Sequence, residues 1–220
     1  MTLTAATASQ GSSPQNCRLA TDGTLTNLGI KQGLLQELTV PAFQVPGFEV
    51  QVTLGTKTHT LLLQAHDIRA DNFQLLVHDK QGLHLAPTPP NTTYRGVVLN
   101  KPASIVAASL LKGQLHATIK LNGALWAVQP IGAANRATHI TFRSRDNLPE
   151  TLGCADFKVT NRVTPIGSSN GSSRMAGSAG NTIYTCEIAC DADNSYYVKN
   201  GSDVITTQND VVRVINGVGA

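Results

Sequence analysis

The chain is short of charge and of long apolar runs. Asp, Glu, Lys and Arg make up 14% of its 220 residues, and the formal net charge is only +3. So small and scattered a charge offers no basic face to nucleic acid. No apolar run approaches the roughly 18 residues that a membrane-spanning helix needs. We therefore expect neither nucleic acid nor a membrane among its partners.

Metal-ligand patterns are also missing. The four cysteines, Cys17, Cys154, Cys186 and Cys190, form no Cys-x-x-Cys pair, which argues against a structural zinc site with four ligands. On a strand, Cys186 and Cys190 would stand about 13 Å apart, too far for a disulfide between them, and we leave both unassigned. The six histidines are scattered, none at helical spacing from another, and we interpret them as ordinary strand residues.

What the sequence does contain is a long series of short, β-prone runs between turns. Residues 48–54 alternate apolar and polar side chains, as a half-buried strand does. Asn122-Gly123 lies between two apolar-rich runs and is the strongest short-range signal for a hairpin. The pattern predicts a β-dominated domain within residues 27–145. The predicted strands cover residues 48–54, 58–64, 73–77, 94–99, 104–111, 115–121, 124–128 and 139–143.

The composition changes after this region. Residues 166–180 are nearly all Gly, Ser, Ala and Asn, which is typical of a flexible linker and of a proteolysis site. Residues 182–189 are β-prone, and the apolar residues of 202–218 predict a helix capped by Ser202 or Asp203. One strand and one helix cannot bury their apolar faces alone. We therefore expect a second domain that starts here and is cut short.

The predicted organisation has four parts. They are a disordered N-terminal segment (1–26), a β-rich domain (27–155), a Gly/Ser-rich linker (156–181), and the N-terminal fragment of a second domain (182–220). The first 16 residues have neither a basic start nor a long apolar stretch, so they are not a signal peptide. We expect the true start of the protein to lie upstream.

Two ordered sets of motifs stand out. The first runs Tyr-Arg-Gly-Val-Val at 94–98, Pro-Ala-Ser-Ile-Val-Ala-Ala-Ser at 102–109, Gly-Gln-Leu at 113–115, Trp-Ala-Val-Gln-Pro at 126–130, and His-Ile-Thr-Phe-Arg at 139–143. The second is Cys-Glu-Ile-Ala-Cys-Asp-Ala-Asp at 186–193. In this order, the first set resembles the propeptide of reprolysin or ADAM-type (adamalysin) zinc metalloproteases, bacterial members included. The second resembles the first strand of their catalytic domain.

The resemblance implies a mainly β propeptide domain of antiparallel strands, a flexible linker, and a βα fragment of an α/β metzincin-type catalytic domain. It implies that the propeptide keeps a secreted zinc-dependent metalloendopeptidase latent and assists its folding, with the chain's own catalytic domain as the partner. The zinc-binding signature of this class, His-Glu-x-x-His on a helix, is absent from these 220 residues. The chain as given is then not catalytic, and the catalytic motif lies outside it.

Cys154 is the residue on which latency would depend. It lies between the β-rich domain and the linker, after Gly153 and before Ala155. In the family, a propeptide cysteine at this place binds the catalytic zinc as a thiolate and fills the position that the hydrolytic water needs. The family's Pro-Lys-x-Cys-Gly context is only partly present here. A disulfide with Cys17, or a buried thiol, is the alternative interpretation.

Three further residues carry smaller expectations. Glu187 matches the glutamate that helps several reprolysins bind a structural calcium, for which a carboxylate is a suitable ligand; an ordinary strand-end glutamate is the alternative. Asp193 is expected to cap or shape the turn after the strand. Arg174, in the linker, is a candidate cut site for a trypsin-like activator.

The strand pattern also fits a protein of another class, a free-standing extracellular β-sandwich module for binding or adhesion. That hypothesis predicts that the terminal strand and helix pack on the β-rich domain. A loosely docked segment 181–220 with an unburied apolar face would count against it. The contact between this segment and the β-rich domain therefore discriminates between the two hypotheses.

Overall fold

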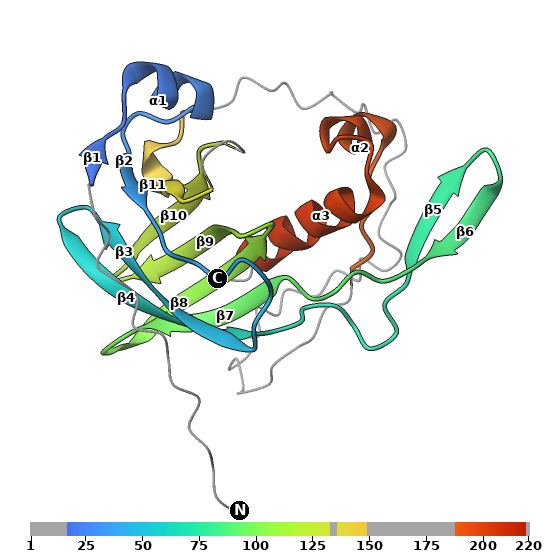
Figure 1. Ribbon diagram of the computed structural model, residues 1–220, viewed down its shortest axis with the longest axis horizontal. Helices are drawn as coiled ribbons and strands as arrows, with labels where there is room; N and C mark the ends of the chain where they lie inside the picture. The colour runs from blue at the N-terminus through green and yellow to red at the C-terminus, as the bar shows by residue number, and fades with distance from the viewer. Residues whose placement is uncertain (1–16, 133–135, 149–187, 219–220) are drawn as a thin grey trace, which may run out of the picture. The chain divides into compact units, whose positions relative to one another are not determined.

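The computed structural model describes residues 17–132, 136–148 and 188–218 of the chain (Figure 1). Nine strands form one antiparallel sheet in the order β1-β2-β11-β10-β9-β8-β7-β4-β3, and β5 and β6 form a separate two-stranded sheet. The strands are β1 (Arg18–Leu19), β2 (Leu34–Glu37), β3 (Gly47–Leu54), β4 (Lys57–Ala65), β5 (Leu75–Asp79), β6 (Gly82–Ala86), β7 (Thr93–Val98), β8 (Lys101–Leu111), β9 (Gln114–Leu121), β10 (Ala124–Pro130) and β11 (Thr138–Arg143). The helices are α1 (Asp22–Leu28), a 3-10 turn at Ser144–Asp146, α2 (Asn194–Lys199) and α3 (Val204–Val218). The predicted mainly antiparallel β fold is confirmed.

Buried and less buried side chains alternate along the strands and show which face of the sheet lines the core; β9 is an example. Leu115, Ala117 and Ile119 are buried on one face of the strand, and the residues between them are only half-buried. At Asn122 and Gly123 the backbone takes φ angles of 50° and 75°, which a two-residue hairpin turn of type I′ requires. This turn joins β9 to β10, so the predicted hairpin is confirmed.

Side chains bring the two ends of the sheet together. Gln36 of β2 accepts a hydrogen bond at Oε1 from the Thr53 amide at 2.8 Å and donates from Nε2 to the Thr53 carbonyl at 3.0 Å. Thr141 of β11 donates to the same carbonyl at 2.9 Å. The sheet therefore curls around its core, as Figure 1 shows. The buried residues of that core are Leu38, Val50, Val52, Leu54, Leu61, Leu63, Tyr94, Val98, Val106, Ala108, Leu110, Leu115, Ala117, Ile119, Leu121 and Val128.

Some elements differ from what the sequence pattern indicates. Within the segment expected to be disordered, residues 18–19 form β1 and residues 22–26 belong to α1. Gly82–Ala86 forms β6, the partner of β5, where the pattern indicates only a turn. β8 begins at Lys101 and not at residue 104, because the preceding turn takes only Leu99 and Asn100.

The C-terminal helices start at capping aspartates. Asp193 Oδ1 accepts a hydrogen bond from the Tyr196 amide at 2.7 Å and caps α2, so its expected capping role is confirmed. Asp203 Oδ2 accepts from the Thr206 amide at 2.7 Å at the start of α3. The helix predicted over 202–218 is therefore confirmed, with Asp203 as its cap.

α3 lies against the large sheet. It contacts β8 most extensively and also touches β7 and β9, and Cys190–Ala220 groups with the β-rich part in one compact unit. This grouping is what the hypothesis of a free-standing β-rich module predicts, and the assignment of 182–220 to a second domain stays a prediction. Of the strand expected over 182–189, the two described residues lie in no strand. No helix in the described ranges is long and apolar enough to cross a membrane.

Candidate functional site

The three residues predicted to act in latency, calcium binding and activation are Cys154, Glu187 and Arg174. All three lie outside the described residues, so their roles stay predictions. Among the residues that are described, no three or more His, Cys, Asp or Glu side chains are grouped so that they could hold a metal ion. Cys17 and Cys190 are exposed free thiols, and Cys17 Sγ donates to Thr53 Oγ1 at 3.4 Å. The functional site must therefore be sought in the contacts between elements.

The outer face of β8 is the strongest candidate. Val106, Ala108 and Leu110 point into the core, so Ala107 and Ser109 point outward. These two outward residues are nevertheless only 2% and 1% exposed, because α3 covers them. Their small side chains let a helix approach the sheet closely. The sequence carried a signal for this contact, namely a run from 104 to 111 that lacks the polar alternation of its neighbours.

α3 meets the sheet with a mainly polar face. Gln208, Val212 and Asn216 are buried and follow one another at intervals of four, so they lie on one side of the helix. Asn216 Nδ2 donates to the Ala108 carbonyl at 2.8 Å. Near the end of the helix, Gly217 faces Thr118 of β9, whose Oγ1 would lie 3.4 Å from an added Cβ. We call this contact of α3 with the outer faces of β7, β8 and β9 the docking site.

The apolar stripe of α3 lies beside the docking site and is incompletely covered. Val204, Val211, Ile215 and Val218 share one side of the helix, since they are spaced by seven, four and three residues. The first three are half-buried and Val218 is 79% exposed. Val214, at the margin of this stripe, is 44% exposed. The helix therefore rests on the sheet by polar residues and leaves its apolar stripe without full cover.

Asp210 organises the charged groups of the docking site. Its Oδ2 accepts from the Tyr196 hydroxyl at 2.6 Å, and its Oδ1 accepts from Arg213 Nε at 2.6 Å. Burial acts to raise the pKa of Asp210, but these hydrogen bonds outweigh it, and the pKa lies below its ordinary value. Burial and the hydrogen bond to Asp210 raise the pKa of the Tyr196 phenol. At neutral pH, Asp210 is thus charged and Tyr196 is neutral.

His116 of β9 belongs to the same cluster. Burial, and to a lesser degree the positive charge of Arg213, lower the pKa of His116 to about 4, although Asp210 opposes them. The imidazole is therefore neutral at pH 7. Its Nδ1 is buried and has no hydrogen-bond partner among the described residues.

Other polar atoms of the docking site are also buried without a hydrogen-bond partner among the described residues. They are Ser109 Oγ of β8, and Gln208 Oε1 and Asn216 Oδ1 of α3. A buried polar atom left unpaired costs about 1–3 kcal/mol unless water reaches it. Among the described residues, these unpaired atoms therefore oppose the hydrogen bond that Asn216 contributes to the docking site.

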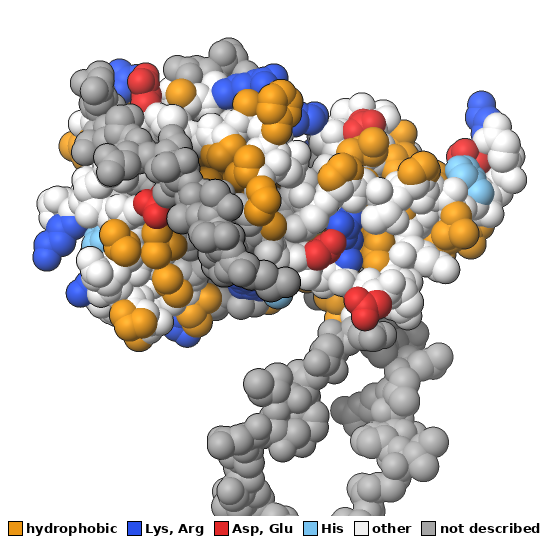
Figure 2. Space-filling view, turned by 60° about the horizontal axis from the view of Figure 1, so that its bottom comes forward, with side chains coloured by type: hydrophobic (Ala, Val, Ile, Leu, Met, Phe, Trp, Pro, Cys, Tyr) orange, Lys and Arg blue, Asp and Glu red, His pale blue; other side chains and the backbone are white. Residues whose placement is uncertain are grey.

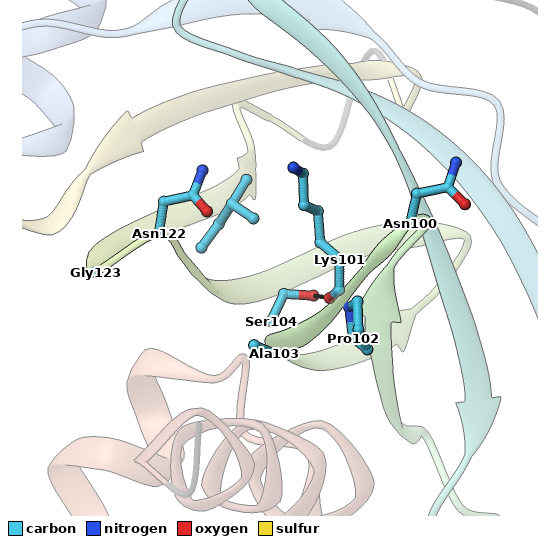
Figure 3. A pocket seen from close by; sticks show the side chains of 8 residues that line it. Asn100, Lys101, Pro102, Ala103, Ser104, Asn122 and Gly123 are labelled. Carbon is cyan, nitrogen blue, oxygen red and sulfur yellow. Dashed lines mark hydrogen bonds between the residues drawn. The ribbon is translucent and has the colours of Figure 1, made fainter.

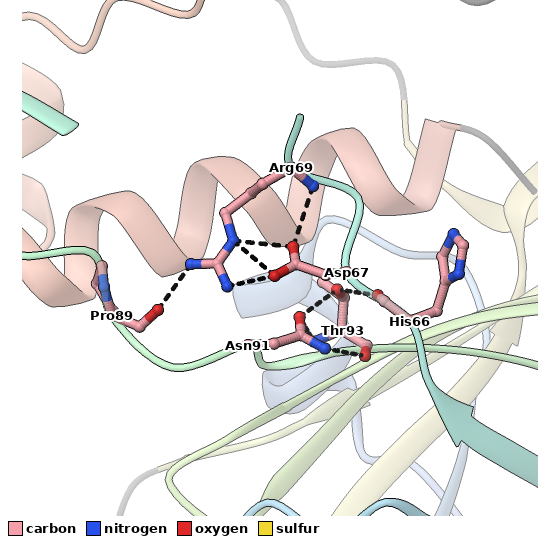
Figure 4. A network of polar contacts seen from close by, with 6 residues as sticks. All are labelled: His66, Asp67, Arg69, Pro89, Asn91 and Thr93. Carbon is pink, nitrogen blue, oxygen red and sulfur yellow. Dashed lines mark hydrogen bonds and ion pairs between the residues drawn. The ribbon is translucent and has the colours of Figure 1, made fainter. Parts of the chain in front are cut away.

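A second polar network holds the segment between β4 and β7 (Figure 4). Arg69, whose side chain is 11% exposed, forms an ion pair with Asp67 and donates from Nη1 to the Pro89 carbonyl at 2.7 Å. The Thr93 hydroxyl donates to the His66 carbonyl at 2.5 Å, and the His66 amide donates to the Thr93 carbonyl at 3.0 Å. The two ends of the excursion that carries β5 and β6 are therefore fastened together.

A small hollow lies between two turns of the sheet (Figure 3). Its only charged group is Lys101, and its one hydroxyl, Ser104 Oγ, donates to the Lys101 carbonyl at 2.6 Å and accepts from the Val98 amide at 2.7 Å. With that hydroxyl engaged in holding the turn, the hollow presents no nucleophile with a base beside it. Its lining residues are Asn100, Lys101, Pro102, Ala103, Ser104, Leu121, Asn122 and Gly123.

The comparisons with known proteins do not identify a relative. No protein-family model matches the chain, and no curated protein matches it. The reprolysin resemblance therefore rests on the motifs in the sequence, and the function that it implies is a proposal.

Proposed function

We propose that this chain is the propeptide region of a secreted zinc-dependent metalloendopeptidase, joined to the first strand and helix of the catalytic domain. The β-rich domain keeps the protease latent and assists its folding. The observation that carries the proposal is the docking site, where α3 touches the sheet by Gln208, Val212 and Asn216 and leaves its apolar stripe incompletely covered.

A helix built to stabilise the β-rich domain would place its apolar stripe on the sheet, because burial of that stripe supplies most of the stability of a packed helix. In α3 the fully buried residues are mainly polar, whereas Val204, Val211 and Ile215 are only half-buried and Val218 is exposed. We take the uncovered part of the stripe as room for further elements of a domain to which α3 belongs. Its polar face, with Asn216 on the Ala108 carbonyl, holds the propeptide by a contact that can open. Both properties are expected of the first helix of a latent protease.

The zinc of this proposal belongs to the catalytic domain and its His-Glu-x-x-His motif. This chain's contribution is one thiolate, from Cys154, in the position that a catalytic zinc otherwise keeps for water. Glu187 is a candidate carboxylate ligand for a structural calcium ion, and Arg174 a candidate activation site.

The test of the proposal is latency of the precursor, meaning this chain followed by its protease domain. We expect Cys154→Ser to release protease activity before any cleavage, because the thiolate no longer occupies the zinc. The matched control is Cys17→Ser, which removes an exposed free thiol and should leave latency intact. Unchanged latency in the Cys154 variant would overturn the proposed mechanism.

A free-standing extracellular binding or adhesion module is the second candidate. It is favoured by one observation, that residues 190–220 group with the β-rich domain in one unit. The two functions differ in what α3 does for that domain. After cleavage at a site engineered into 156–181 and removal of the C-terminal piece, a propeptide should keep its Tm within a few degrees. A module with α3 as an integral part should lose most of its stability.

A further inference from the structure

β5 and β6 form an arm with no third strand. The two strands pair only with each other in the described structure, and the arm extends from the large sheet in Figure 1. An isolated two-stranded hairpin is marginally stable in water and normally needs a surface to pack on. We therefore expect the arm to be stabilised by packing against a partner.

One face of the arm is apolar and uncovered. Leu76 lies opposite Leu85, and His78 lies opposite Leu83, so these four side chains share one face. The leucines at 76, 83 and 85 are 52%, 66% and 62% exposed. Figure 2 shows hydrophobic and histidine side chains gathered on this arm. We call these four residues the leucine face; three neighbouring exposed leucines are unusual on a surface that faces only water.

The arm is held in place at its base. Arg69 links Asp67, before β5, to the Pro89 carbonyl, after β6, and its guanidinium lies over the Phe73 ring at 5.5 Å. A few residues further on, Thr93 pairs with His66 (Figure 4). These bonds fix the ends of the arm to β4 and β7. A braced base presents the leucine face in a defined direction, which lowers the entropy that a partner must remove.

The base of the arm continues into the docking site. Thr93 is the first residue of β7, and β7 is one of the strands that α3 contacts. A domain that starts with α2 and α3 is therefore seated next to the root of the arm. Its half-buried apolar stripe, with Val218 exposed at the end, lies on α3.

We propose that the leucine face is a second contact of the β-rich domain with its protease domain, so that the propeptide holds the protease both by the docking site and by the arm. This inference rests on the proposed function, since the occupant is the domain that begins with α2 and α3. The leucines at 76, 83 and 85 supply apolar anchors, whereas the docking site supplies polar ones.

Amide hydrogen exchange of the arm is the first test. In the 220-residue chain alone, the amides of 75–86 should exchange fast, because a lone hairpin opens readily. In the precursor they should exchange at least about tenfold more slowly, since the partner covers the leucine face. This comparison uses the native arm and does not depend on whether a variant folds. Equal exchange in the two proteins would overturn the inference.

A double substitution, Leu83→Asp with Leu85→Asp, is the second test. After cleavage within 156–181, the variant β-rich domain should dissociate from the protease domain on the order of tenfold faster than the wild type, as expected for loss of buried apolar anchors. The control is Leu125→Asp on β10, which removes a leucine that is 40% exposed and lies outside the arm. Equal dissociation rates for the double variant and the control would overturn the inference.

The outcomes separate this inference from the proposed function. Suppose that the precursor is latent through Cys154, but that the amides of the arm exchange as fast as in the 220-residue chain. The proposed function then stands, and the leucine face has no part in it. A precursor that is not latent removes both. A dimer of the 220-residue chain in light scattering that the Leu83→Asp, Leu85→Asp variant abolishes would assign the leucine face to a second copy of the chain and overturn the inference.

Discussion

Asn216 of α3 reaches across 108 positions of sequence to donate a hydrogen bond to the backbone carbonyl of Ala108 in β8. The amide group is buried, yet its oxygen has no partner among the described residues. One half of the side chain therefore holds the helix to the sheet, and the other half opposes the contact. The balance makes this residue the most sensitive point at which to test the docking site.

Asn216→Ala should loosen α3 without affecting the sheet. The lost hydrogen bond is worth about 1 kcal/mol and removal of the unpaired oxygen offsets part of it, so the amide exchange rate of 204–218 should rise by at most about fivefold. Exchange in β9 should stay unchanged, because its ladder with β8 is intact. The control is Val214→Ala, on the exposed side of the same helix. An equal effect of the two substitutions would show that helix propensity, and not the contact with Ala108, governs the docking.

Acid should weaken the folded unit through His116. Its pKa is about 4 in the folded chain and near 6.5 when unfolded, so the unfolded state binds the proton more readily. Stability from this group is complete above pH 6.5 and is lost as the pH falls from about 6.5 to about 4, by on the order of 3 kcal/mol. His139, whose pKa burial also lowers, acts in the same direction. The low pKa of Asp210 matters only below this window.

Urea unfolding between pH 4 and 7 measures this effect. His116→Gln should flatten the dependence of the free energy of unfolding on pH, because the amide does not titrate. His78→Gln, on the exposed arm, is the matched control and should leave the dependence as it is. A His116 variant with the same pH dependence as the wild type would assign the effect to other groups.

Gln36 should be essential to the curl of the sheet. Gln36→Ala leaves the Thr53 amide without its partner and the Thr53 carbonyl with Thr141 as its remaining donor, and we expect the free energy of unfolding to fall by about 1–3 kcal/mol. Gln51→Ala, on β3 but half-buried, should cost under about 1 kcal/mol. Urea titration of the two variants checks the difference. Similar midpoints would mean that the core alone keeps the sheet curled.

Gly123→Ala tests how strongly the hairpin turn depends on a residue that tolerates a positive φ. An added Cβ meets no atom within 4 Å, but the residue has a φ of 75°, so the expected loss is about 1–2 kcal/mol from backbone strain alone. Gly132→Ala also meets no neighbouring atom and has no positive φ, and it should cost almost nothing. Thermal unfolding distinguishes the two. Equal Tm values would contradict the assignment of the turn.

Local patterns made most of the sheet predictable. Strands such as β3 and β9 alternate apolar and polar residues, and Asn122-Gly123 demands its turn. β6 was missed because Leu83 and Leu85 alternate with no buried face to confirm a strand. α1 and β1 were missed because a polar, Thr-rich composition resembles that of a mobile terminus.

The candidate site was harder to predict because it depends on long-range contacts. No spacing rule indicates that Gln36 joins β2 to β3, or that Asn216 meets Ala108. The polar face of α3 also contradicts the ordinary expectation that a helix docks by its apolar stripe. Sequence motifs predicted a latency residue, Cys154, and a calcium ligand, Glu187, but both lie outside the described ranges.

The docking site joins two parts of one chain, which has a consequence for effective concentration. While α3 and β8 are covalently linked, each side meets the other at a local concentration that reaches the order of millimolar. A contact with a dissociation constant in that range stays substantially closed. A single cut between them replaces this local concentration by the far lower bulk concentration of the separated pieces. The same unchanged contact then opens by dilution alone.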